Sequence, residues 1–203
     1  MPLSDLTPEL QDAFRARLAL LGIDPQTVVK RIGPDTHQGP VILSANPEQS
    51  AIKPHMFAVQ DVDQMKELAG NQDQHYEHGL MQEHHSVPEP WPDHLNDLTD
   101  AAMGPEHRSA VHHAHLVYLY GNSAKVDSYR DIINQTEYPR MVPVFAAEEL
   151  VVTAANSPYV ITCESGHVYG IVTIYNGGSL QFEGNVDFSC QKMVQSDLPG
   201  PPK

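Results

Sequence analysis

The sequence predicts an α+β protein in which a helical N-terminal part and an irregular middle pack on a C-terminal, mainly antiparallel β-sandwich or barrel. Residues 141–195 are rich in β-branched and aromatic residues, with turn residues about every 6 to 12 positions. Between Leu180 and Gln191, apolar and polar residues alternate, as in strands with one face on a core. Near the N-terminus, by contrast, apolar residues recur at helical spacing.

Six strands are predicted in the C-terminal third: Val142–Ala147, Leu150–Ala154, Tyr159–Cys163, Val168–Tyr175, Ser179–Glu183 and Val186–Gln191. Asn176-Gly177-Gly178 favours a hairpin turn, because these residues tolerate positive φ. A short right-handed β-helix is the alternative, but the strand spacing does not look constant enough to indicate a repeat. Either form leaves sheet edges that could pair with another chain.

The rest of the chain divides into segments that differ in composition and in hydrophobic periodicity. Residues 1–33 predict two helices, the first beginning at Thr7-Pro8 and the second restarting at Asp24-Pro25. Residues 34–111 are irregular, acidic and rich in histidine, with short helices at 61–68 and 93–103. Residues 112–140 predict a buried strand at 113–120, a glycine-containing loop and a helix. The module at 141–195 is followed by a loose tail, 196–203.

Charge excludes some classes of partner. The 203 residues include 12 Lys or Arg and 26 Asp or Glu, giving a net charge of −14 with histidine neutral. This predicts no nucleic-acid and no membrane partner, because phosphate surfaces require a basic face. No apolar stretch approaches the roughly 20 residues of a spanning helix. The absence of a signal peptide predicts a cytoplasmic protein, although export without a signal would leave the same sequence.

Histidine is concentrated in the middle of the chain. Ten of the 12 histidines fall between His55 and His115. Imidazole suits zinc, nickel and copper, so a divalent transition metal is the expected cofactor if the chain has one. Two groups are candidates. If residues 75–85 are helical, one helix face carries His75, His78 and His85. If residues 113–120 form a strand, His113 and His115 point the same way, with His167 as a distant third ligand.

These patterns support two functions. The first is a non-enzymatic binding or self-assembling β-module protein with a pH- or metal-responsive histidine-rich segment, acting as a homo-oligomer or with a protein partner. The alternative is a metal-dependent enzyme with a histidine site on the β-sheet, in which Glu164 or Glu183 acts as base. No recognised nucleophile motif supports serine catalysis.

Two further interpretations remain open. Cys163 and Cys190 are expected to be buried free thiols, although adjoining strands would allow a disulfide; a catalytic Cys163 would require His167 as its base. A small-molecule pocket between helices and sheet would be lined by Tyr118, Tyr120, Phe145 and Tyr175, residues that equally suit an ordinary core.

We predict acid-induced association. With 12 basic residues, 26 acidic residues and 12 histidines, full protonation of the histidines brings the net charge to −2. Histidine titrates near ~6.5, so most of the repulsion between copies disappears between about pH 7 and pH 5. Light scattering from pH 7.5 down to the sequence pI of 5.1 should therefore rise. Constant scattering over this range would contradict the prediction.

Overall fold

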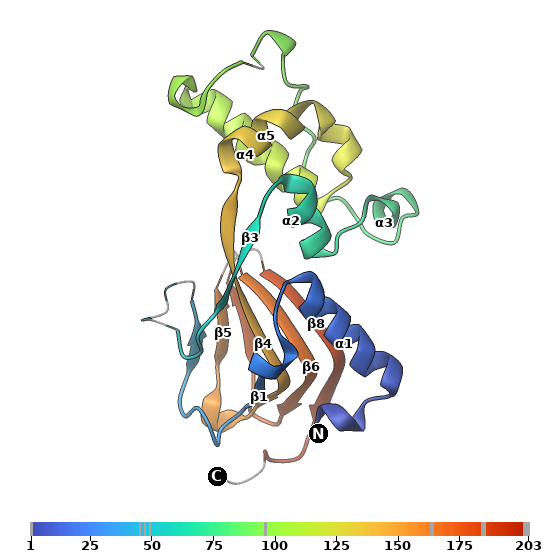
Figure 1. Ribbon diagram of the computed structural model, residues 1–203, viewed down its shortest axis with the longest axis vertical. Coiled ribbons are helices and arrows are strands. Elements are labelled where there is room, and N and C mark those ends of the chain that lie inside the picture. Colours follow the sequence, from blue (N-terminus) through green and yellow to red (C-terminus); the bar gives the residue numbers. More distant parts are fainter. Residues whose placement is uncertain are drawn as a thin grey trace. The chain divides into compact units, whose positions relative to one another are not determined.

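The chain folds as two compact units. The computed structural model describes residues 2–44, 46, 48, 50–95, 97–162, 165–183 and 186–200. One unit, here called the coil unit, comprises Met1–Phe57 and Val142–Lys203; the other, the helical unit, comprises Ala58–Met141 (Figure 1). The helical unit is thus an insertion into the sequence of the coil unit.

The coil unit contains one α-helix and most of the strands. In chain order its elements are η1 (Leu3–Asp5), α1 (Pro8–Leu20), η2 (Pro25–Thr27), β1 (Val29–Ile32), β2 (Val41–Leu43), β3 (His55–Val59), β4 (Arg140–Val152), η6 (Ala154–Asn156), β5 (Tyr159–Thr162), β6 (Ser165–Tyr175), β7 (Leu180–Glu183) and β8 (Val186–Ser196). The ends of β3 and β4 extend into the helical unit, whose own elements are α2 (Val62–Ala69), α3 (Asp73–Glu77), η3 (Asp93–Leu95), η4 (Asp100–Ala102), α4 (Pro105–Tyr120), η5 (Ser123–Tyr129) and α5 (Arg130–Glu137).

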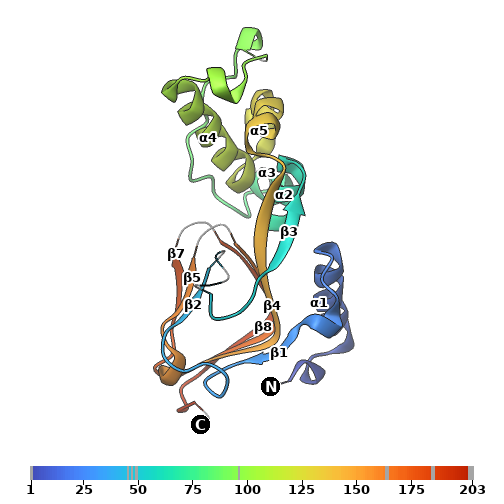
Figure 2. The ribbon, with the colours of Figure 1, turned by 60° about the vertical axis from the view of Figure 1, so that its left-hand side comes forward.

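The strands form two parallel sheets, so the antiparallel sandwich or barrel predicted from the sequence is wrong. One sheet has the order β1-β4-β6-β8, with β3 also paired to β4; the other has the order β2-β5-β7 (Figure 2). Every pairing along these two paths is parallel. The turn at Asn176–Gly178 is tight and Gly177 has φ +80°, as predicted, but it joins β6 to β7, which belong to different sheets. It is therefore a corner and not a hairpin.

The pairing registers show that the chain winds in successive coils. Val144 on β4 lies opposite Gly166 on β6, and Gly166 lies opposite Asp187 on β8, steps of 22 and 21 residues. In the second sheet Tyr159 lies opposite Leu180, a step of 21. Each coil thus contributes one strand to each sheet, which is the arrangement of a parallel β-solenoid.

Columns of side chains in register fill the space between the two sheets. One column contains Leu150, Val172 and Met193; another contains Phe145, His167 and Phe188. Leu150 and Val172 are fully buried, whereas Met193, in the last coil, is 52% exposed. The second sheet repeats this pattern, because Ile161 is fully buried and Phe182, opposite it on β7, is 50% exposed. The core therefore ends in exposed apolar side chains at the C-terminal coil.

Helix α1 lies against β6 and β8 (Figures 1 and 2). As predicted, it begins with Pro8 at its first turn and buries Phe14 and Leu18. Arg17 donates to the carboxylate of Asp187 on β8 at 2.9 Å. Burial raises the pKa of Asp187 to about 6, against the opposing effect of Arg17. This ion pair fixes α1 to the last strand.

A buried lysine ties the helical unit together. The Nζ of Lys66 on α2 donates to the carbonyl oxygens of Tyr118 and Gly121 at 2.6 and 2.7 Å, and lies 2.9 Å from the Asp73 carboxylate. A buried ammonium is costly unless all its protons are bonded, so these partners hold α2, the start of α3 and the end of α4 in one arrangement.

For two elements, the sequence predicted the wrong type of secondary structure. Residues 113–120, predicted as a strand, belong to helix α4, which begins at Pro105 and buries Val111, Ala114 and Tyr118 along one face. After Asp24-Pro25 the chain makes the short η2 and then β1, not a second helix. For residues 113–120 the β-branched and aromatic content was a poor guide, because burial in the tertiary structure decides short apolar runs. After Asp24-Pro25, by contrast, the β-branched Val29 and Ile32 suit the strand that forms.

One column offers a test of the coil arrangement. Replacing Leu150 by Ala should lower the free energy of unfolding by about 2–5 kcal/mol, because it leaves a cavity in the interior. Replacing Met193 by Ala should cost less than about 1 kcal/mol, because half of that side chain is already in water. Urea unfolding followed by far-ultraviolet circular dichroism at low micromolar concentration measures both. Equal losses of unfolding free energy would show that Leu150 does not lie in the interior of a column that ends at Met193.

Candidate functional site

The structure separates the two histidines proposed as a metal-binding pair. His113 and His115 are two residues apart on α4, so their side chains leave the helix about 200° apart. His115 is buried, and its Nε2 lies 2.9 Å from the Tyr138 hydroxyl. The Nε2 of His113 lies 3.5 Å from the Ser86 hydroxyl. The strand geometry on which a shared site depended is therefore absent at these residues.

The second histidine group is not on one helix face either. α3 ends at Glu77, so His75 lies within the helix, His78 follows its last residue, and His85 lies in the segment beyond. Within the described ranges, no three His, Cys, Asp or Glu side chains are grouped so that they could hold a metal ion. The structure thus does not bring together the predicted ligands that it describes.

His167 is an interior residue of the coil unit. Its ring stacks on Phe145 at 5.1 Å and on Phe188 at 6.3 Å. Its Nε2 lies 2.9 Å from the Ser165 hydroxyl and its Nδ1 lies 3.2 Å from the Tyr169 hydroxyl. Burial lowers the pKa of His167 to about 3. Because both ring nitrogens have partners, His167 serves the core as a neutral, hydrogen-bonded member of an aromatic column.

Cys163, the candidate catalytic thiol, and Glu164, a candidate base, lie outside the described residues. Cys190 is a half-buried free thiol on β8. Burial raises its pKa, which keeps it protonated. Glu183, the other candidate base, is exposed at the end of β7.

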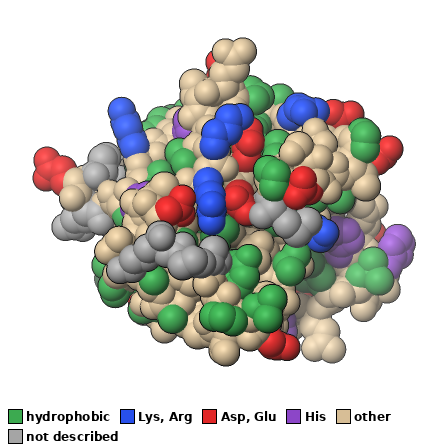
Figure 3. All heavy atoms as spheres, turned by 90° about the horizontal axis from the view of Figure 1, so that it is seen from below, with side chains coloured by type: hydrophobic (Ala, Val, Ile, Leu, Met, Phe, Trp, Pro, Cys, Tyr) green, Lys and Arg blue, Asp and Glu red, His purple; other side chains and the backbone are tan. Residues whose placement is uncertain are grey.

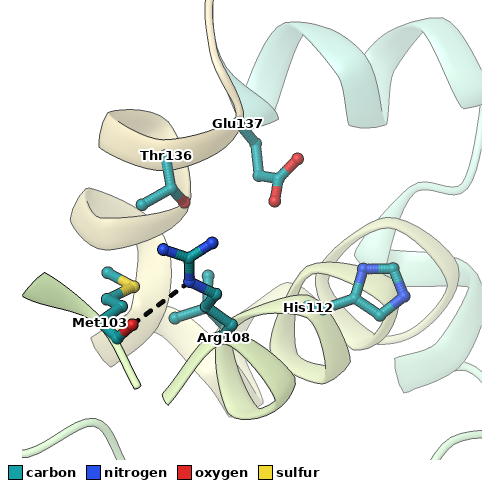
Figure 4. A pocket seen from close by; sticks show the side chains of 6 residues that line it. Met103, Arg108, His112, Thr136 and Glu137 are labelled. Carbon is teal, nitrogen blue, oxygen red and sulfur yellow. Dashed lines mark hydrogen bonds between the residues drawn. The ribbon is translucent and has the colours of Figure 1, made fainter. Parts of the chain in front are cut away.

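A pocket that sequence reasoning did not identify lies between α4 and α5. Its volume is about 220 Å³ and its lining comprises Met103, Arg108, Val111, His112, Thr136 and Glu137. Arg108 and His112 are four residues apart on α4, and the Arg108 side chain points toward the end of α5 (Figure 4). The Nε of Arg108 donates to the Met103 carbonyl oxygen at 3.3 Å.

The chemistry of this pocket is mixed. A guanidinium, an imidazole and a carboxylate surround an apolar floor formed by Met103 and Val111, so no single charge sign dominates. Next to it, burial lowers the pKa of His115 to about 4, with Arg140 and His112 adding to the effect. At about 220 Å³ the pocket is smaller than a typical small-molecule site, and its lining does not select one class of ligand.

The most distinctive feature is the C-terminal end of the coil unit, here called the open end. It consists of β7 and β8, which are the edge strands of the two sheets, and of the interior side chains that end there: Leu180, Phe182, Phe188, Cys190 and Met193. Phe182 and Phe188 contact each other edge to face at 5.4 Å. β8 is eleven residues long and, among the described strands, pairs only with β6. The open end therefore presents a long row of backbone donors and acceptors beside apolar side chains.

Comparisons with known proteins add no functional information. No family model, curated protein or solved structure matches the chain. Among the described residues, no helix has the length and apolar character needed to cross a membrane. On the face drawn in Figure 3, acidic and basic side chains are interspersed with hydrophobic ones, without an extended basic region.

The two buried histidines predict loss of stability in acid. In the unfolded chain each titrates near ~6.5, whereas in the folded chain each stays neutral until about pH 4 or 3. The unfolded chain therefore binds more protons below pH 6.5, and the free energy of unfolding falls by about 2 kcal/mol per histidine at pH 5. The raised pKa of Asp187 acts in the opposite direction and returns about 1 kcal/mol over the same range.

A substitution at His115 measures how much this histidine contributes to the pH dependence of stability. Replacing His115 by Gln should reduce the fall in unfolding free energy between pH 7 and pH 5 by about 2 kcal/mol. Urea titrations at several pH values measure this slope, which is independent of any constant loss of stability. Replacing His78, which is exposed, supplies the control. If the His115 variant keeps the slope of the unmodified chain, the buried imidazole is not its source.

Proposed function

We propose that the chain is a non-enzymatic binding and assembly protein, which adds an extended strand of a protein partner to the open end of its coil unit. One observation carries the proposal. β8 is an eleven-residue strand at the edge of its sheet, and the core beside it ends in exposed apolar side chains. Strand addition satisfies backbone groups and covers apolar surface in one step.

The composition of β8 supports this proposal. Proteins usually protect an exposed edge with charges, proline, a bulge or a covering segment, and the terminal repeats of solenoids carry a polar outer face. Val186–Ser196 contains no proline, and its charged residues are Asp187 and Lys192. Asp187 is turned to Arg17 on α1. Lys192 is then the remaining charge along an edge of eleven residues, which is little protection.

The histidine-rich helical unit supplies the responsive part of the proposal. Most of its histidines lie outside the core, so their protonation changes net charge without breaking buried contacts. Loss of negative charge lowers the repulsion between acidic copies or between this chain and an acidic partner. Zinc, nickel or copper bound at the same histidines would change the charge in the same direction.

The alternative, a metal-dependent enzyme, required His113 and His115 on one face of a strand. Helix α4 directs them to different sides, and His167 belongs to the aromatic column of the coil unit. Among the residues that the structure describes, no contact favours this alternative.

A labelled peptide tests strand addition. A fluorescent peptide with the sequence of Val186–Ser196 should bind the chain at micromolar protein concentration, because it can pair with β8. Replacing Met193 in the protein by Lys should weaken binding at least ten-fold, whereas Ile42→Lys should leave it unchanged. These two side chains are 52% and 46% exposed, which makes them a matched pair, and Ile42 lies on β2 at the opposite edge of the second sheet.

The peptide itself provides the second control. A peptide with proline in place of Gln191 and Met193 cannot form a continuous ladder and should not bind. Fluorescence anisotropy reads all six combinations of the three proteins and the two peptides. Equal anisotropy with the parent and proline peptides would refute strand addition at β8.

A further inference from the structure

We infer that the partner at the open end is a second copy of this chain, so that two copies form a closed dimer in which β8 pairs antiparallel with β8 across a two-fold axis near Gln191. This inference rests on the proposed function. It specifies which strand is added, and in which direction.

Charge favours a second copy at this end. The whole chain carries a net charge of −14, which makes most approaches between copies unfavourable. At the open end the charged side chains are Glu183, Lys192 and Asp187, and Asp187 is paired with Arg17. The remaining carboxylate and ammonium balance each other, so two open ends can meet without net repulsion.

Strand length favours a closed pair over a filament. In a filament, β8 of one copy would meet the N-terminal edge of the same sheet in the next copy, which is divided between β1, of four residues, and β3, of five. Such strands can pair with only part of an eleven-residue edge. A second β8 matches the whole edge, and identical strands related by a two-fold axis pair antiparallel, which closes the assembly at two copies.

The apolar side chains of the open end gain cover in the same arrangement. Phe182 and Met193, each about half exposed, would be covered by the open end of the other copy. A strand of eleven residues is roughly 36 Å long, and the two sheets lie roughly 10 Å apart. An end face of this size buries several hundred Å² on each copy, which is at the small end of specific interfaces and implies a dimer that dissociates on dilution.

The first experiment measures mass against concentration. Size-exclusion chromatography with light scattering at pH 7.5 should show a monomer at low concentration and a mass approaching two copies, about 45 kDa, at high concentration. Met193→Lys should raise the dissociation constant at least ten-fold, and Ile42→Lys should leave it unchanged. Circular dichroism of each variant establishes that it is folded.

A charge-exchange experiment tests the two-fold axis. Gln191→Lys and Gln191→Glu each place like charges near the axis, so each variant alone should dissociate at least ten-fold more readily. An equimolar mixture places opposite charges there and should restore the dimer. Restoration supports the antiparallel pairing; failure of the mixture to restore it overturns that pairing.

Other outcomes overturn the inference and can be told apart from failure of the proposed function. Masses that grow beyond two copies, or a dimer that Met193→Lys does not weaken, exclude the closed β8 pair. A monomer at all concentrations that still binds the strand peptide overturns the inference and leaves strand addition intact. A monomer that also ignores the peptide removes both.

Discussion

The stacking of side chains in register between coils is the constraint on which the rest of the molecule depends. Each coil buries its interior residues only because the next coil lies on top of them: Leu150 is covered by its neighbours, and Met193, at the same position in the last coil, is half in water. Parallel pairing, the fully buried His167 and the exposed rings of the open end all follow from this one arrangement. Nothing within such a column limits the number of coils, so the last coil must be covered by a capping segment or by another chain.

Most strands of the C-terminal third were predictable, whereas their partners were not. Val142–Ala147 and Leu150–Ala154, predicted as two strands, are the single strand β4 up to Val152. Alternation between apolar and polar residues identifies which face of a strand is buried, and it located β5, β7 and the start of β8 correctly. It carries no information about which strand lies beside it. The repeat does carry this information, but it is hard to see in the sequence. The step changes from 22 residues between β4 and β6 to 21 between β6 and β8, and residues in register can differ in type, as Glu149 and Ile171 do. Gly177 then suggested a hairpin, since a positive φ marks a tight corner in either topology.

For the candidate site residues, the sequence showed which side chains could bind a metal ion, but not which of them would lie close together. The run His113–Tyr120 reads equally as buried strand or helix, and the decision depends on Pro105 and on the face shared by Val111, Ala114 and Tyr118. The interior position of His167 has a signal in the sequence. His167 lies between Ser165 and Tyr169 at two-residue spacing, so that in a strand all three side chains share one face and can bond to one another. A polar side chain between two such neighbours makes its hydrogen bonds within the core and is not available to bind a ligand.

The pairing registers on either side of the helical unit show how the solenoid accommodates this insertion. Ile32 lies opposite Leu150, and Val41 lies opposite Tyr159, so the offset across the insertion is identical in the two sheets. The path from Ile32 to Val41 therefore has the length of the coil above it, and the insertion enters after that path is complete, without altering its geometry. The first coil nevertheless gains its covering coil only when β4 and β5 are in place, more than a hundred residues later. Pairing over such a separation carries a large loop-closure cost in entropy, which a helical unit that folds early would reduce by bringing Phe57 and Val142 toward each other. On this reasoning the helical unit contributes to the assembly of the coil.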